Sequence, residues 1–79
     1  MTGNAHMTLI DAPIGMRVRI RHLTSRPEIS TRLRELGFCE NAVVRCVTKG
    51  YGNIICEVYN TRVGLDSGLA RRIHVSVSE

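Results

Sequence analysis

The chain has 79 residues, of which 43% are apolar, and a formal net charge of +4 from eleven Lys and Arg against seven Asp and Glu. This length allows one domain with a small core, and the modest basic charge is compatible with an acidic protein, a membrane surface or nucleic acid as a partner. The sequence has no apolar run of the about 18 residues that a membrane span needs and no secretory leader, so we expect no insertion into a membrane.

The N-terminal part of the chain is expected to lead into a strand. Residues 1–7 show no hydrophobic period and are predicted to form a disordered tail, followed by a single domain over 8–79. Proline and glycine predict a turn at 11–15. Apolar residues then alternate with three arginines over 16–21, which predicts a half-buried strand with its arginines in solvent.

One stretch, 25–38, has clear helical periodicity. Its apolar residues Ile29, Leu33 and Leu36 recur at i, i+4 and i+7 and therefore share one face. A helix of this length is marginal alone in water, so it must bury that face on another element. The pattern predicts a helix over 27–36 that packs as a plug on the strands.

Both ends of this predicted helix carry capping signals. Ser25 and Glu28 have the spacing of a capping box, and Pro27 suits the first turn because its missing N–H costs nothing there. At the other end, Gly37 suits the left-handed residue that stops a helix, and Phe38 can then fold back onto the helix.

A hairpin is predicted after the helix. Alternation indicates strands over 42–49 and 53–59, joined by a loop over 50–52 that is closed by a glycine bulge. Inner residues must oppose inner residues, so Cys46 should face Cys56. The same register sets Val44 opposite Val58 and Arg45 opposite Glu57.

The C-terminal part predicts two more strands. A turn at 60–61 leads into a strand over 62–65, and Asp66 can cap one helical turn over 67–69. A last strand over 73–77 directs its apolar residues inward. The expected fold is mainly β, a small SH3-like, partly open barrel of about five strands with one inserted α-helix.

Short motifs follow one another in a fixed order along the chain. They are Leu9 with Pro13-x-Gly15, Val18-x-Ile20, Arg32-Leu-x-Glu-Leu-Gly37-Phe38, a glycine-rich turn at 50–52, Val63-Gly-Leu65 and Ala70-x-x-Ile-x-Val75. From Thr8 to Val77 their order and spacing resemble the FeoA family, small cytosolic accessory proteins of bacterial ferrous-iron uptake. The chain departs from the family pattern where Glu40-Asn41 replaces the usual Pro-Gly, although Asn tolerates a left-handed turn.

The resemblance implies a fold, a partner and a role. The fold is the SH3-like barrel with its inserted helix, and the partner is the membrane transporter FeoB, which carries its own cytosolic GTP-binding domain. The resemblance also implies a connection with transition metal ion binding. We therefore expect a non-enzymatic accessory protein that binds the cytosolic part of FeoB and modulates it, with no cofactor of its own.

The residues themselves favour neither an enzyme nor a metal protein. The sequence lacks a Gly-x-x-x-x-Gly-Lys phosphate loop, paired carboxylates on one element, and a nucleophile with a plausible base. The soft ligands of the domain, which do not have the close spacing of a structural metal site, are His22, His74, Cys39, Cys46 and Cys56. We expect Cys46 and Cys56 to be small buried apolar residues. An odd number of cysteines without Cys-x-x-Cys predicts a reducing compartment, and hence the cytoplasm.

Nucleic-acid binding is the alternative of a different class, together with binding of a regulator protein by a free-standing SH3-like module. The arginines that could follow a phosphate backbone are Arg17, Arg19, Arg21, Arg71 and Arg72. Recognition of single strands or bases favours stacking aromatic residues, and the chain has only Tyr51, Tyr59 and Phe38. We therefore expect this arginine face to be solvated rather than to bind nucleic acid.

A docking surface is expected around the helix and the loop that follows it. Arg32 and Arg34 should project away from the apolar stripe, with Phe38 and Cys39 supplying apolar surface beside them. Protein interfaces favour this combination of arginine and an aromatic residue around an apolar centre. The alternative is that both arginines are ordinary solvated residues of the helix.

Overall fold

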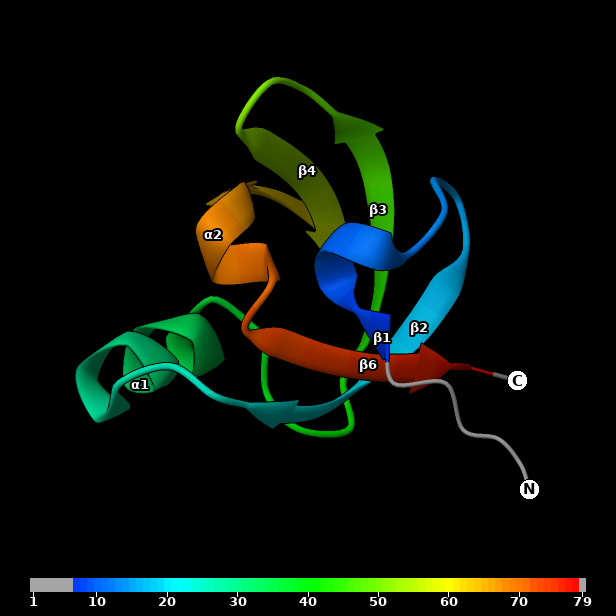
Figure 1. Ribbon diagram of the computed structural model, residues 1–79. Helices are drawn as coiled ribbons and strands as arrows, with labels where there is room; N and C mark the ends of the chain where they lie inside the picture. Colours follow the sequence, from blue (N-terminus) through cyan, green and yellow to red (C-terminus); the bar gives the residue numbers. More distant parts are fainter. Residues whose placement is uncertain (1–6, 79) are drawn as a thin grey trace.

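The computed structural model describes residues 7–78 as one six-stranded antiparallel sheet with two helices and a 3-10 turn (Figure 1). The elements are β1 (Met7–Thr8), η1 (Leu9–Asp11), β2 (Arg17–Leu23), α1 (Pro27–Glu35), β3 (Val43–Lys49), β4 (Asn53–Val58), β5 (Thr61–Asp66), α2 (Ser67–Ala70) and β6 (Ile73–Val77). In the described part of the chain, no helix is long and apolar enough to cross a membrane.

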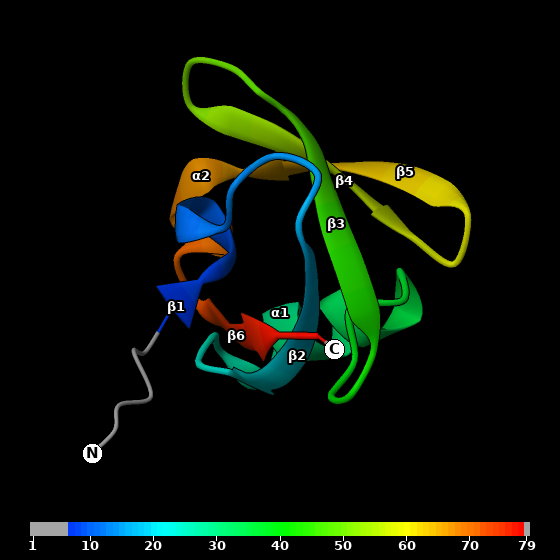
Figure 2. The same cartoon turned by 90° about the vertical axis from the view of Figure 1, so that its right-hand side faces the viewer.

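The sheet curls into the partly open barrel that the sequence predicts (Figure 2). Its strand order is β1-β6-β2-β3-β4-β5, so β1 and β5 are edges that do not pair with each other. The strand that the sequence did not indicate is β1, in which Met7 pairs with Val75. Met7 is therefore not part of a disordered tail, and residues 1–6 lie outside the described residues.

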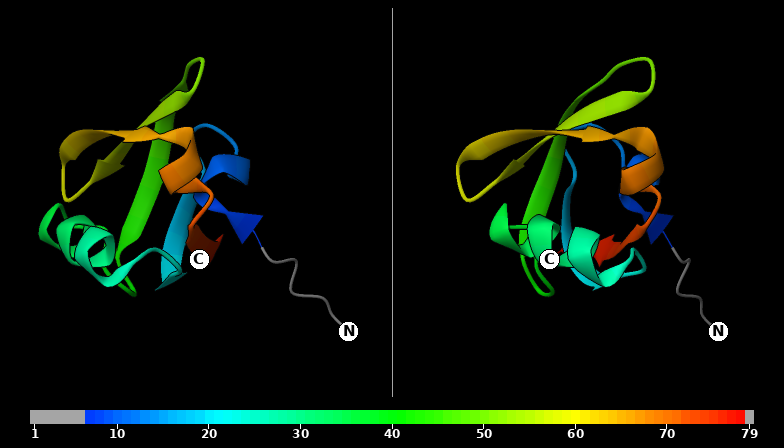
Figure 3. Two further views of the ribbon diagram at one scale, coloured as in Figure 1. Left: turned by 60° about the vertical axis from the view of Figure 1, so that its left-hand side comes forward. Right: turned by 90° about the vertical axis from the view of Figure 1, so that its left-hand side faces the viewer.

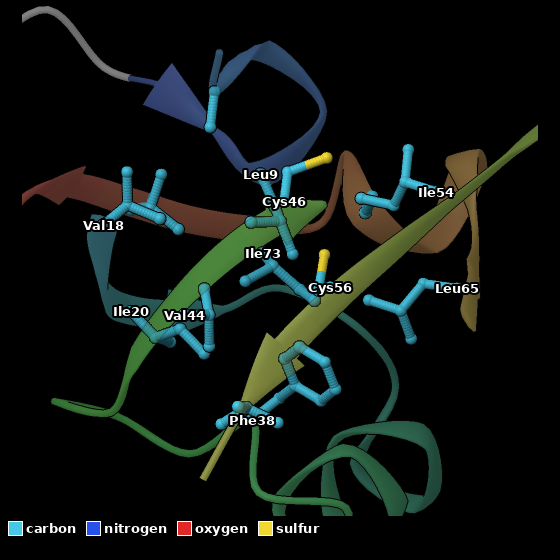
Figure 4. Close-up of a cluster of buried hydrophobic side chains, with 14 of the residues drawn as sticks. Leu9, Val18, Ile20, Phe38, Val44, Cys46, Ile54, Cys56, Leu65 and Ile73 are labelled. Carbon is cyan, nitrogen blue, oxygen red and sulfur yellow. The ribbon is translucent and has the colours of Figure 1, made fainter. Parts of the chain in front are cut away.

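The core fills the inside of this curled sheet. Phe38 and the inward side chains of the strands are fully or almost fully buried there. Strands β3 and β4 pair Cys46 with Cys56 and Val44 with Val58, which confirms the predicted register. Both cysteines are free thiols on the inner face (Figure 4).

Two details of the hairpins differ from the predictions. The β3–β4 ladder shifts register at Val47, so Lys49 pairs with Ile54 and the bulge lies within the strand rather than in the glycine loop. The next turn consists of Tyr59 and Asn60, one residue earlier than predicted, and both have positive φ, at 51° and 63°. This is the two-residue hairpin geometry that matches the twist of the strands.

Strands β2 and β6 show the predicted alternation of buried and exposed side chains, except at the end of β6. On β2, Val18 and Ile20 are buried while Arg17 and Arg21 are exposed, as predicted. On β6, Ile73 and Val75 are buried, and their strand follows α2, whose start Asp66 caps as predicted. Val77 was predicted to point inward but is exposed. It is the last residue of the last strand, where the core has already ended.

Helix α1 ends as predicted but begins differently. Gly37 has φ +104°, and the Phe38 amide donates to the Leu33 carbonyl at 2.9 Å, which is the hydrogen bond of a Schellman cap. The predicted capping box is absent, because Arg26 is the N-cap residue and makes no side-chain capping bond. The Ser25 hydroxyl has no hydrogen-bond partner among the described residues.

The face that α1 buries is rotated relative to the prediction. Leu33 is 1% exposed, but Ile29 and Leu36 are 40% and 41% exposed, and the second buried residue is Ser30. At 100° per residue, Ser30 lies about 60° to one side of Leu33, and the two exposed residues lie about 40–60° to the other side. The helix therefore packs on the sheet through the line between Leu33 and Ser30 and leaves the rest of its apolar stripe uncovered.

Candidate functional site

The exposed flank of α1 faces a groove between this helix, β5 and α2. The groove has a volume of about 1030 Å³. Both views of Figure 3 show α1 running beneath β5, with α2 at the end of that strand. The groove combines apolar side chains with charged ones.

Two contacts hold α1 alongside β5 and leave space between them. Before the helix, the Thr24 amide and hydroxyl both donate to the Arg72 carbonyl, at 3.0 and 3.2 Å. After the helix, Gly37 lies so close to Tyr59 that a Cβ on the glycine would approach the tyrosine ring to 3.1 Å. Between these two points the helix contacts the core through Leu33, so the groove is built into the fold.

The lining of the groove is apolar at its centre. Leu33 and Leu65 close the bottom, and Ile29, Leu36 and the half-buried Leu69 form the walls. Single exposed apolar residues are common on protein surfaces, but a group that shares one concave site marks an interaction surface.

The rim of the groove carries more positive than negative charge. Arg26, Arg32 and Arg72 line it, against Glu28 and Asp66. The Asp66 carboxylate is already engaged, because it accepts a hydrogen bond of 2.6 Å from the Gly68 amide at the start of α2. The rim therefore favours a partner with negative charge beside an apolar group.

The four residues that the sequence indicated for docking do not form one surface. Arg32 lines the groove, whereas Arg34 points to the other side and forms a two-point contact with Glu40, at 3.1 and 2.9 Å. Phe38 is fully buried and supplies no surface, because the Schellman cap turns it into the core. Cys39 is half-buried, with its sulfur 4.0 Å from the Tyr59 hydroxyl.

An exposed ion pair connects the loop after α1 to the helix. The Arg34 guanidinium, by hydrogen bonding, lowers the pKa of Glu40 from 4.5 to about 2. On the same side, the contact with Cys39 raises the pKa of the Tyr59 hydroxyl. These contacts stabilise the loop over 39–41, in which Asn41 has φ +74° as predicted. They give Arg34 and Cys39 a local structural role on the side away from the groove.

The residues that sequence reasoning missed lie on β5 and α2. Gly64, Leu65 and Leu69 line the groove, but they are about 30 residues along the chain from α1, and no local pattern links the two segments. A signal was present in α1 itself. Its apolar stripe is wider than the single line of contact that a helix of this length makes with a small barrel.

The arginine face of β2 is largely engaged in contacts within the protein. Arg19 donates to the Asn41 carbonyl at 2.9 Å, and Arg21 donates to the Ser76 hydroxyl at 2.7 Å. On the neighbouring strand, Arg45 lies opposite Glu57 as predicted and forms an ion pair with it, at 2.6 Å. Arg17 lies opposite Arg45 and lines a second, polar hollow of about 510 Å³. This face offers fewer uncommitted cations than the sequence indicates.

Four of the five soft ligands form two separate pairs, and the fifth, Cys39, lies apart from both pairs in the loop after α1. The rings of His22 and His74 stack at 4.6 Å on β2 and β6, at the outer side of the sheet. Cys46 and Cys56 lie in the core, where burial beside Cys46 raises the pKa of the Cys56 thiol to about 12. In residues 7–78, no group of three or more His, Cys, Asp or Glu side chains is placed to hold a metal ion.

Comparison with known families gives one match that spans nearly the whole chain. The model of the FeoA domain matches residues 7–77. No curated protein matches the chain.

Solved structures share this fold. Stenotrophomonas maltophilia FeoA in complex with zinc is 32% identical, with a TM-score of 0.76 over 89% of each chain. It is described as a prokaryotic SH3 domain protein for which a role as a ferrous-iron-transport activating factor is suggested. Iron(II) transport protein A from Clostridium thermocellum is 27% identical, with a TM-score of 0.83 over 90% of this chain and 45% of that one. A manganese-dependent transcriptional repressor, 16% identical, has a TM-score of 0.84 over 96% of this chain and 38% of its own, which shows the fold alone.

Proposed function

Because the chain belongs to the FeoA family, we propose that it is a non-enzymatic accessory protein of bacterial ferrous-iron uptake. It acts in the cytoplasm by binding the cytosolic part of the FeoB transporter and modulating it. The observation that carries this proposal is the groove between α1, β5 and α2, an apolar site with a basic rim that the fold holds open. Such a surface fits a protein partner, since aromatic or aliphatic anchors buried in a pocket supply most interface energy.

The test is co-purification with the cytosolic portion of FeoB, with and without guanine nucleotide. The groove variant is Ile29→Gln, and the matched control is Ile55→Gln. Ile55 is 39% exposed against 40% for Ile29, but its side chain lies on the outer face of β4 and does not line the groove. The two substitutions therefore remove similar apolar area from the surface and differ mainly in position.

We expect Ile29→Gln to weaken binding by about tenfold or more, as for an interface anchor, while Ile55→Gln leaves it unchanged. Circular dichroism should be native for both. Wild-type protein that does not co-purify with the transporter portion in either nucleotide state would overturn the proposed function. Equal loss in both variants would show that the groove is not the docking site.

The charge of the rim allows a second, independent variant. The double variant Arg32→Glu with Arg34→Glu reverses two charges and should weaken transporter binding. Only Arg32 lines the groove. Arg32→Glu alone should therefore account for the loss of transporter binding. Arg34→Glu alone should leave binding intact and loosen the loop, because it places a like charge beside Glu40.

A further inference from the structure

The side of the groove opposite α1 is the free edge of a strand. Among the described residues 7–78, β5 pairs with β4 on one side only. An edge strand presents unpaired backbone N–H and C=O groups that can hydrogen bond to another chain. The groove borders this edge at residues 64–66, so a segment lying in the groove would run beside it.

The direction of the free groups follows from the ladder. The Ser67 amide donates to the Gly52 carbonyl at 2.9 Å, which makes 52 and 67 a hydrogen-bonded pair. Hydrogen-bonded and non-hydrogen-bonded pairs alternate along an antiparallel ladder. Counting along the register, Ile55 opposite Gly64 is a non-hydrogen-bonded pair, as is Glu57 opposite Arg62. The peptide groups of Arg62 and Gly64 therefore point away from β4, to the free edge.

The residue at the centre of this edge has no side chain. A Cβ built on Gly64 would have no atom within 4 Å, and the residue does not have a positive φ, so neither crowding nor a left-handed backbone requires glycine here. Glycine in the interior of a strand often marks a bulge, a bend or the close approach of another backbone, and the β4–β5 register has no bulge at Gly64. At Gly64 this place lies on the free edge and in the lining of the groove.

We infer that the transporter partner binds through an extended segment that pairs with the free edge of β5 at Arg62 and Gly64 and places an apolar side chain between Ile29 and Leu36. This inference rests on the proposed function and adds the form of the bound segment. Backbone hydrogen bonds supply affinity in such strand addition, and pockets for alternate side chains supply specificity. The arginines at the rim, Arg26, Arg32 and Arg72, select a segment with acidic residues beside the apolar one.

The discriminating pair of variants is Gly64→Pro and Gly64→Ala in the full chain. Proline removes the outward N–H and places a ring carbon at the free edge, and the ladder keeps its bonds because this N–H does not pair with β4. Alanine keeps the N–H and adds a methyl group in open space. With the cytosolic portion of FeoB as the probe, we expect binding by Gly64→Ala within about twofold of wild type and by Gly64→Pro weaker by about tenfold or more.

Amide hydrogen exchange on the wild-type chain gives a second readout that needs no variant. Exchange at the Arg62 and Gly64 amides should slow when the transporter portion binds. If Gly64→Pro binds as tightly as Gly64→Ala, or if both amides keep exchanging rapidly in the complex, strand pairing is overturned while the proposed function stands. Absence of any binding by the wild type overturns the proposed function and the pairing with it. Slow exchange at Gly64 that depends on the concentration of the chain alone would assign the edge to a second copy and overturn the transporter segment.

Discussion

The barrel interior and the groove beside it use similar apolar residues with opposite outcomes. On β3 and β4 every predicted inward residue is buried, including Cys46 and Cys56. On α1 only one of the three predicted residues, Leu33, is buried, and the other two line the groove. The difference lies in geometry. Strands β3 and β4 each pair with a strand on both sides, so the register decides which of their side chains face inward. The short helix α1 contacts the small barrel along only one line.

This contrast separates residues that maintain the fold from residues available for recognition. The inner side chains of the barrel are buried, so substituting them should lower the free energy of unfolding. Ile29 and Leu36, on the walls of the groove, are partly in water in the folded protein, so substituting them should mainly weaken binding.

The largest expected effect is in the core where α1 meets the barrel. Phe38→Ala should lower the free energy of unfolding by about 3–5 kcal/mol, and Leu33→Ala by about 2–5 kcal/mol, because each leaves a cavity in a sealed site. In a domain of this size, that approaches the whole stability. Urea unfolding followed by circular dichroism measures both changes. An unchanged midpoint for Leu33→Ala would show that α1 is not anchored through this residue.

The same substitution, Cys to Ser, can be made in the buried core and at a half-buried surface position. Cys56→Ser should cost about 1–3 kcal/mol, since it buries a hydroxyl in the apolar core. Cys39→Ser, at a half-buried position near the loop, should cost less than about 0.5 kcal/mol. Thermal unfolding of the two variants measures the difference.

Thiol labelling of the native wild-type chain adds a kinetic readout of the same comparison. A water-soluble disulfide reagent should modify Cys39 first, because the thiolate is the reactive form and burial raises the pKa of Cys56 to about 12. Cys46 and Cys56 should react only as fast as the barrel opens. Modification of all three at one rate would mean that the core is not sealed.

Substitutions on the walls of the groove should cost little stability and weaken binding. Ile29→Ala and Leu36→Ala should each cost less than about 1 kcal/mol of stability, because much of each side chain is already in water. Both should weaken binding of the transporter portion. Calorimetric unfolding and titration on the same samples measure the two effects, and a cost similar to that of Leu33→Ala would show that the stripe is buried as a whole in solution.

The smallest effect concerns the ion pair behind the helix. Arg34 lowers the pKa of Glu40 from 4.5 to about 2, so the pair stabilises the fold above pH 4.5 and this contribution is lost as the pH falls towards 2. Both side chains are more than one third exposed, so the contribution is small. An NMR titration of the Glu40 carboxyl should give a pKa near 2 in the wild type and a normal one in Arg34→Gln. A normal value in both would place Arg34 in solvent.

Much of the fold could be predicted from local patterns. Alternation fixed the inner faces of the strands and the pairing of Cys46 with Cys56, and Gly37 marked the end of the helix. Strand β1 was missed because a two-residue strand has no period to detect. The sequence predicts the bulge in the glycine loop, whereas the structure has it at Val47. The position of a bulge depends on how the sheet curls, which the turn residues do not determine.

The site was less accessible to sequence reasoning than the fold. Arg32 is exposed and lines the groove, whereas Phe38, which the sequence predicts both in the helix cap and on a docking surface, lies in the core. The rotation of α1 about its axis decides which flank is exposed, and periodicity does not determine it to within 60°. The groove also needs β5 and α2, which are brought to α1 only by the closure of the sheet.

We predict that the transporter binds in the groove rather than on the face of β2 and β3 that carries Arg17 and Arg45. The most direct measurement is an NMR titration of the isotope-labelled chain with the cytosolic portion of FeoB. We predict that amide shifts and line broadening concentrate at Ile29, Leu36, Gly64, Leu69 and Arg72. Perturbations concentrated instead at Arg17, Arg45 and Tyr59, with the groove unaffected, would show that the transporter does not bind in the groove.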